Sequence, residues 1–169
     1  MNNRFSITVF LCFCIMGCTN APHPNQPVTV ASDPFARASV LAFINSYFDA
    51  ARRSDVDALI EHYAPQVDYY SWGAVDRDLV RTDKQDYHTR WPEVSYALDD
   101  VNNLQILDTV QPNERIVEYK LAFAVHNPAK AGARNRISGT AYHVWLLRAD
   151  STGLKIIRET QQVLERNKQ

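Results

Sequence analysis

The residues of this sequence that could carry acid–base chemistry are a histidine, a glutamate and several tyrosines. His143 and Trp145 fall on one face of an alternating segment, and Tyr142 falls on the other. A general acid or base needs a tuned pKa and hydrogen-bond contact with the reacting atom, and spacing along the chain sets neither. We therefore take His143, Glu159 and Tyr47 as candidate lining residues of a pocket that acts by proton transfer on a small hydrophobic substrate.

The same residue types also have a structural interpretation. A strand histidine can be a hydrogen-bonded or surface residue, and buried tyrosines can fill the core with the hydroxyl at its rim. The tyrosines concerned are Tyr47, Tyr63, Tyr69, Tyr96, Tyr119 and Tyr142. We predict no metal site and no cofactor, because there is no glycine-rich phosphate loop and four histidines lie far apart, namely His62, His88, His126 and His143.

The most distinctive polar group in the middle of the chain consists of Arg77, Asp83, Arg90 and Trp91. Asp83 precedes Arg90 by seven residues, which places both on one face of a helix. As a binding site, the group would lie at a pocket rim and hold an anionic or sugar ligand. As a structural group, Arg90 would stack on an aromatic ring, pair with a carboxylate and pack through its apolar stem. Both interpretations stay open on the sequence.

The amino-terminal segment has the layout of an export signal. Arg4 is followed by Ile7 to Met16, which is apolar apart from Thr8. This run is about half of the roughly 20 residues that a membrane-spanning helix needs, so it fits a signal sequence. It ends at Ile15-Met16-Gly17-Cys18, which resembles the lipobox of bacterial lipoproteins. The resemblance implies cleavage before Cys18, acylation of its thiol and export to the cell envelope.

The lipoprotein interpretation divides the chain into a signal peptide (1–17), a lipidated, proline-rich tether (18–34) and one domain (35–166). In enterobacterial lipoproteins, an aspartate directly after the lipidated cysteine resembles an inner-membrane retention signal. This sequence has Thr19 at that position, which favours the outer membrane, facing the periplasm, in a Gram-negative source. Removing residues 1–17 takes away one basic residue, so the formal charge changes from −1 to −2. We expect no nucleic-acid partner, because such a partner needs a basic footprint.

Hydrophobic spacing predicts helices first and strands later. The first helix opens at Asp33-Pro34 and ends at Arg52 to Ser54, and the second runs from Asp55 through Tyr63 until Pro65 stops it. The third begins after Asp76 or Asp78 and ends at Trp91-Pro92. The predicted strands cover 66–72, 94–98, 104–110, 115–125, 137–148 and 154–164. Segregated helices and strands indicate an α+β fold, a curved antiparallel sheet wrapped around the amino-terminal helices.

The domain also resembles the nuclear-transport-factor-2-like superfamily, the cone fold shared with SnoaL-like cyclases. The stretch that carries the resemblance runs from Val67-Asp68-Tyr69-Tyr70 through Gly73, Val75, Arg77, Val80, Asp83, Tyr87, Arg90-Trp91-Pro92, Tyr96 and Leu98. It implies a pocket between sheet and helices, and a homodimer through the sheet face. We expect an envelope module that binds a small ligand or a protein partner, with a lyase or isomerase as the alternative.

The lipobox generates a direct prediction. Cys18→Ser should block acylation and correct processing, because the serine hydroxyl does not replace the acylated thiol. The wild-type protein should partition into detergent and incorporate labelled fatty acid, and the variant should do neither. The domain should fold unchanged, since no core residue is altered. A wild-type protein that does not partition into detergent and keeps an unmodified thiol at Cys18 would contradict the lipoprotein interpretation.

Overall fold

The computed structural model describes residues 33–130 and 135–168, so the predicted signal peptide and Cys18 lie outside the described residues. Among the described residues, no helix is long and apolar enough to cross a membrane. In chain order, the elements are α1 (Arg37–Arg52), α2 (Val56–Ile60), β1 (Tyr63–Tyr69), β2 (Ala74–Asp76), α3 (Arg77–Arg90), β3 (Glu93–Leu98), the short 3-10 helix η1 (Val101–Asn103), β4 (Gln105–Asp108), β5 (Glu114–His126), β6 (Arg136–Asp150) and β7 (Gly153–Lys168).

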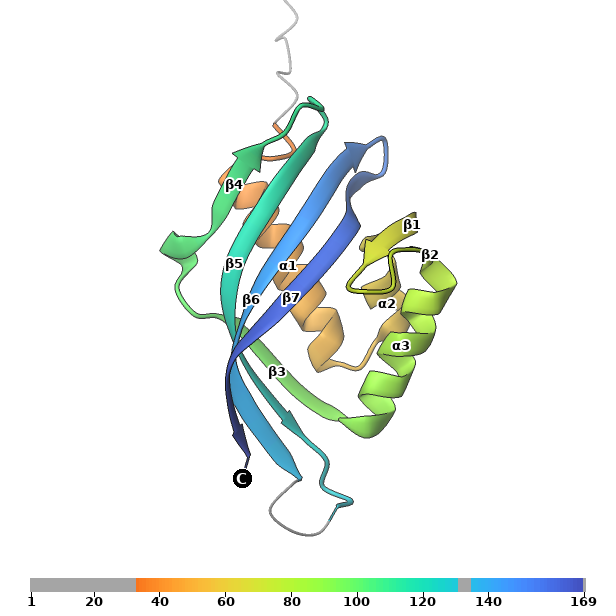
Figure 1. Ribbon diagram of the computed structural model, residues 1–169, viewed down its shortest axis with the longest axis vertical. Coiled ribbons are helices and arrows are strands. Elements are labelled where there is room, and N and C mark those ends of the chain that lie inside the picture. Colours follow the sequence, from red (N-terminus) through yellow and green to blue (C-terminus); the bar gives the residue numbers. More distant parts are fainter. Residues whose placement is uncertain (1–32, 131–134, 169) are drawn as a thin grey trace, which may run out of the picture. The chain divides into compact units, whose positions relative to one another are not determined.

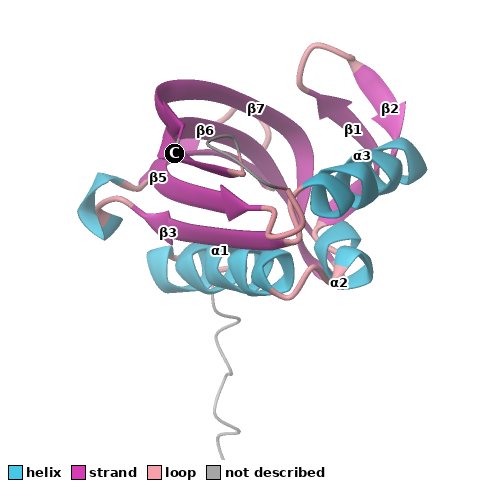
Figure 2. Ribbon diagram, turned by 90° about the horizontal axis from the view of Figure 1, so that it is seen from below, coloured by secondary structure: helices cyan, strands magenta, loops and turns pink. Residues whose placement is uncertain are grey.

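One curved sheet forms the frame of the domain. Its strand order is β2-β1-β7-β6-β5-β3, and β4 also pairs with β5. Figures 1 and 2 show the long strands curling, with α1 across their concave side and α3 beside β1 and β2. The predicted α+β class and the curved sheet are confirmed. One pairing differs from the expected antiparallel run, because β1 lies parallel to β7.

Helix α1 buries an apolar face against the sheet. Val40, Ile44, Tyr47, Phe48 and Ala51 are buried and recur at helical spacing. The helix begins at Arg37, about one turn later than the sequence predicts, because the carboxylate of Asp33 accepts a 2.9 Å hydrogen bond from the Phe35 amide in a preceding turn. The sequence pattern therefore identifies the buried face correctly and places the start of the helix too early.

The segment around Tyr63 was predicted incorrectly. Helix α2 ends at Ile60, and Tyr63 begins β1, which continues through Pro65. Proline is tolerated within this strand because the pairing with β7 is irregular between Tyr63 and Asp68, and the pairing with β2 begins only at Gln66. The irregular register therefore leaves Pro65 at a position where a missing amide hydrogen breaks no regular ladder.

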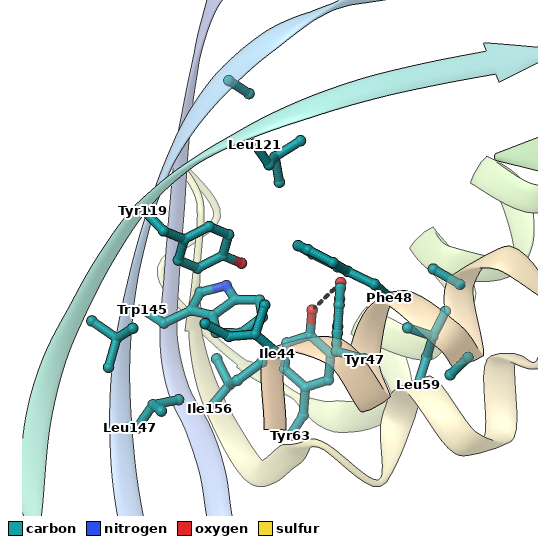
Figure 3. Packing of buried hydrophobic residues seen from close by; sticks show 14 of the residues in the cluster. Ile44, Tyr47, Phe48, Leu59, Tyr63, Tyr119, Leu121, Trp145, Leu147 and Ile156 are labelled. Atoms are coloured by element: carbon teal, nitrogen blue, oxygen red, sulfur yellow. Dashed lines mark hydrogen bonds between the residues drawn. The ribbon is translucent and has the colours of Figure 1, made fainter. Parts of the chain in front are cut away.

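The long strands β5, β6 and β7 each have an inner and an outer face. His143 and Trp145 lie on the inner face of β6 and are buried. Tyr142 lies on the outer face, where its hydroxyl donates a 2.6 Å hydrogen bond to Glu118. The inner face packs on α1 in an aromatic core, in which Trp145 contacts Tyr47 with ring centroids 5.1 Å apart (Figure 3).

Candidate functional site

The concave side of the sheet encloses a cavity of about 430 Å³. The apolar part of the lining that the sheet contributes consists of Leu121, Phe123, Val125, Ile137, Ala141 and Val163. Helix α3 contributes a polar wall of Asp83, Lys84, Tyr87 and His88, and Trp91 follows at its end. The sheet also contributes polar lining residues, namely His143, Glu159, Gln161 and Arg166. The cavity lining therefore combines apolar carbon, mainly from the sheet, with ionisable groups from both α3 and the sheet.

The polar wall arises from the spacing of residues on α3. Val80, Lys84 and His88 recur every four residues and form the buried face of the helix. Asp83 is adjacent to this face, and its carboxylate accepts a 2.6 Å hydrogen bond from the hydroxyl of Tyr69 on β1. Helix α3 thus uses its inward face to present charge to the cavity, which is the reverse of an ordinary amphipathic helix.

A buried ion pair forms the centre of the site. The Lys84 ammonium is 3.8 Å from the Glu159 carboxylate, and these residues are 9% and 0% exposed. Glu159 accepts hydrogen bonds on both oxygens, from Tyr63 at 2.5 Å and from Tyr70 at 3.0 Å. The ammonium also lies 5.4 to 5.9 Å from the centroids of four tyrosine rings, those of Tyr47, Tyr63, Tyr69 and Tyr70.

The surroundings keep both members of the pair charged. Burial opposes ionisation of Glu159, but Lys84 and the tyrosine hydroxyls outweigh it and lower the pKa of the carboxyl. Burial likewise opposes protonation of Lys84, but Glu159 and the surrounding tyrosines together outweigh it and raise the pKa of the ammonium well above its usual value. The pair therefore stays charged at neutral pH, and Lys84 does not act as a free amine nucleophile.

His143 lies beside this pair with its ring lining the cavity. Its Nδ1 is 3.9 Å from a carboxylate oxygen of Glu159, which is longer than a hydrogen bond. Burial lowers the pKa of His143 to about 4, because it outweighs the opposing attraction of Glu159. The imidazole is therefore neutral at pH 7 and is a weak base.

The structure brings some of the predicted site residues together and separates others. His143, Glu159 and Tyr47 all line the cavity, as do Asp83 and Trp91. Arg77 lies half-buried at the start of α3, outside the cavity lining, and Arg90 is exposed at its end. The backbone carbonyl of Arg90 accepts a 2.9 Å hydrogen bond from the Asn127 side chain.

Sequence reasoning missed Lys84, which is the buried cation at the centre of the site. A lysine in a polar helix is ordinarily exposed to solvent, so its charge predicts an exposed position and not a buried one. The available signal was its spacing, four residues after Val80 and four before His88, on the face that meets β1. Among the described residues, no three histidine, cysteine, aspartate or glutamate side chains are grouped to hold a metal ion.

Comparison with known proteins identifies the fold. No family model and no curated protein matches the sequence. A solved structure from Novosphingobium aromaticivorans, provisionally named a scytalone dehydratase, has a TM-score of 0.67 at 12% identity, covering 78% of this chain and 86% of that one. A second from the same organism, provisionally named an aromatic ring hydroxylase, has a TM-score of 0.67 at 12% identity, covering 79% and 92%.

A third solved structure bears the name of the fold. It is a nuclear-transport-factor-2-like superfamily protein from Salmonella enterica, with a TM-score of 0.63 at 12% identity, covering 75% of this chain and 89% of that one. The domain therefore has the nuclear-transport-factor-2-like cone fold. The fold hosts many functions, so the chemistry must be argued from the cavity of this chain.

The ion pair yields a prediction for stability. Lys84→Met should lower the free energy of unfolding by about 3 to 5 kcal/mol, because it leaves Glu159 charged and buried without its cation. The double variant Lys84→Met with Glu159→Gln should recover most of this loss. Lys120→Met is the matched control, since its ion pair with Asp99 is partly exposed and should contribute about 1 kcal/mol or less. Equal losses from Lys84→Met and Lys120→Met in urea unfolding would contradict this assignment.

The neutral His143 yields a prediction for pH dependence. The pKa of His143 is about 4 in the folded domain and 6.5 in the unfolded chain. The contribution of the neutral imidazole to the free energy of unfolding is therefore fully present above pH 6.5 and is lost as pH falls toward 4. Between pH 7 and 4.5 this amounts to about 2.5 kcal/mol of unfolding free energy. His143→Gln should remove that part of the dependence of the unfolding free energy on pH.

Urea unfolding at the two pH values measures the effect. Some slope should remain in His143→Gln, because burial also lowers the pKa values of His62 and His88. A wild-type slope in His143→Gln would show that this imidazole is not held neutral by burial.

Proposed function

We propose that the cone domain binds a small, uncharged, mostly apolar molecule with a few polar groups, and that a lipid on Cys18 holds the domain at the cell envelope. The observation that carries the binding proposal is the cavity of about 430 Å³, whose lining combines apolar and ionisable side chains. Its size falls within the range of about 300 to 1,000 Å³ that is typical of small-molecule sites. A ligand with an apolar body and a few polar groups complements this mixed lining.

The charges around the cavity favour an uncharged ligand. Lys84 and Arg166 supply two positive charges, and Asp83 and Glu159 supply two negative charges. The imidazoles of His88 and His143 are neutral at pH 7, because burial lowers the pKa of each. A charged ligand would lose hydration without gaining a net counter-charge, which is unfavourable in a partly buried site.

The envelope part of the proposal rests on the sequence. The apolar run from Ile7 to Met16 and the lipobox-like end at Cys18 support export and acylation. A cysteine carrying two or more acyl chains anchors stably, since one chain alone binds membranes only marginally. A binding module held in this way would meet its ligand outside the cytoplasm.

Proton-transfer catalysis is the second candidate function, and one observation favours it. His143 is neutral, lines the cavity and lies near the Glu159 carboxylate, as a general base would. It ranks second because a pKa of about 4 makes the imidazole a weak base at neutral pH. Glu159 is also a poor base, since Tyr63 and Tyr70 donate hydrogen bonds to both of its oxygens.

Filling the cavity tests the binding function. Ala141→Leu, at a buried residue of the lining, should weaken binding of 2-ethylnaphthalene about tenfold or more, because the larger side chain occupies ligand space. The matched control is Ala122→Leu, on the neighbouring strand and outside the cavity lining, which should leave binding unchanged. The wild-type domain should bind 2-ethylnaphthalene more tightly than anionic 2-naphthoate, as followed by naphthalene fluorescence. Equal binding of 2-ethylnaphthalene by Ala141→Leu and Ala122→Leu would show that the probe binds outside the cavity.

Hydrogen exchange discriminates the two candidate functions. In deuterium oxide, the methyl hydrogens of 2-acetylnaphthalene exchange when a base removes a proton next to the carbonyl. We expect the wild-type domain to exchange them no faster than His143→Gln does, because the imidazole is a weak base. NMR measures the rate. A rate that rises with wild-type protein and falls in His143→Gln would favour the enzyme instead.

A further inference from the structure

A serine and a histidine form a hydrogen-bonded pair on the exposed side of α1. The Oγ of Ser46 on α1 is 2.8 Å from Nε2 of His62, which lies in the short connection between α2 and β1. Ser46 is exposed and His62 is half-buried, and neither residue lines the cavity. The pair is therefore separate from the site to which the binding function is assigned.

Two backbone carbonyls set the orientation and the tautomer of the imidazole. Nδ1 of His62 is 2.9 Å from the carbonyl oxygen of Ala58 and 3.3 Å from that of Leu59. A carbonyl oxygen only accepts hydrogen bonds, so Nδ1 carries the ring proton. The ring also meets those of Phe43 and Tyr47 edge to face, with centroids 5.0 and 5.5 Å apart. The imidazole is therefore held in place, with Nε2 left as its acceptor.

The Nε2 lone pair can act as a base toward the serine hydroxyl. Burial lowers the pKa of His62, and the positive charge of Lys155 adds to this, against the opposing effect of the carbonyl hydrogen bonds and Glu61. The imidazole is therefore neutral at pH 7. The Ser46 hydroxyl also contacts the carbonyl oxygen of Phe43 at 2.8 Å, so its single proton can point to either acceptor. A hydroxyl beside an oriented, neutral imidazole is the arrangement that activates a serine nucleophile.

A cation lies beside the pair. Lys155, near the start of β7, donates a 2.6 Å hydrogen bond from Nζ to the carbonyl oxygen of Glu61, the residue before His62. When a hydroxyl attacks an ester, negative charge develops on the carbonyl oxygen of the ester, and a nearby positive charge stabilises it. The surface thus combines a nucleophile, a base, carbonyls that orient the base and a neighbouring cation, which are the parts that acyl transfer requires.

We propose that Ser46 is a nucleophile activated by His62, and that it accepts acyl groups from activated esters. Oγ of Ser46 forms a bond to the carbonyl carbon of the ester, and Nε2 of His62 takes the hydroxyl proton. The bond from that carbon to the alcohol oxygen then breaks, and Nε2 returns the proton to the departing oxygen. The products are an ester on Ser46 and the free alcohol.

The exposed position of the pair sets the class of substrate. A surface without a surrounding cavity holds a substrate by few contacts, so the reaction relies on the leaving group and not on binding energy. The donors that fit are therefore esters of phenols or thiols, which depart readily. Water that attacks the acyl group, again with Nε2 as base, releases the acid and restores the Ser46 hydroxyl.

Covalent labelling tests the nucleophile directly. The wild-type protein is mixed with p-nitrophenyl butyrate at neutral pH, samples are quenched with acid, and mass spectrometry of its peptides locates the butyryl groups. We expect Ser46 to be acylated about tenfold or more faster than Ser71 and Ser151, which are exposed serines elsewhere on the domain. Release of p-nitrophenolate should follow the same time course as the labelling of Ser46.

Substitution of the base tests the role of the histidine. His62→Gln should slow acylation of Ser46 about a hundredfold, because an amide cannot take the hydroxyl proton, while its NH₂ group can still donate to the Ala58 carbonyl. The matched control is His126→Gln, at a partly exposed histidine paired with Glu93, which should leave the rate at Ser46 unchanged. Thermal unfolding followed by circular dichroism checks that both variants are folded.

Two results would overturn the inference. The first is acylation of Ser46 in the wild-type protein no faster than that of Ser71 and Ser151, a comparison that needs no variant. The second is an equal rate at Ser46 in wild type and His62→Gln, which would show that the hydroxyl reacts without its base. Because the binding function is tested with naphthalene probes in the cavity, failure of either proposal leaves the other standing.

Discussion

The arrangement of this domain depends on one buried ion pair between α3 and β7. Lys84 and Glu159 lie far apart in the sequence, and their attraction compensates for removing both charges from water only because tyrosine hydroxyls bind the carboxylate and tyrosine rings surround the ammonium. The pair fixes the distance between the helix and the sheet. It therefore holds open the space between them, which an all-apolar interface would close by packing.

Much of the fold could be predicted from local patterns, and the errors have physical causes. The apolar stripe of α1 and the alternation of β5 fixed their faces, because both signals are periodic and local. Tyr63 was misassigned to a helix because a tyrosine after Leu59 and Ile60 extends an apolar stripe, and because proline is usually a boundary. The parallel contact of β1 with β7 joins residues almost a hundred positions apart, and no local pattern encodes it.

The candidate site could be predicted only in part for the same reason. His143, Glu159 and Tyr47 were identified by residue type, and the fold brings all three to one cavity. Which face of β6 is inner depends on how the sheet curves, so spacing alone could not assign His143 to the interior and Tyr142 to the exterior. Lys84 was missed because its burial requires Glu159, and a charged residue is predicted as buried only when its partner is known.

The cavity takes its lining from two kinds of element, a sheet and a single helix. The sheet lining comes from strands whose backbones are fixed by neighbouring strands, whereas the polar wall of Asp83, Lys84, Tyr87 and His88 is presented by the single helix α3. Substitutions at Asp83, Tyr87 or His88 would therefore alter the polar wall while the strand ladder and the Lys84–Glu159 pair persist. A lineage with this architecture can change the specificity of its cavity through one helix face, without rebuilding the scaffold.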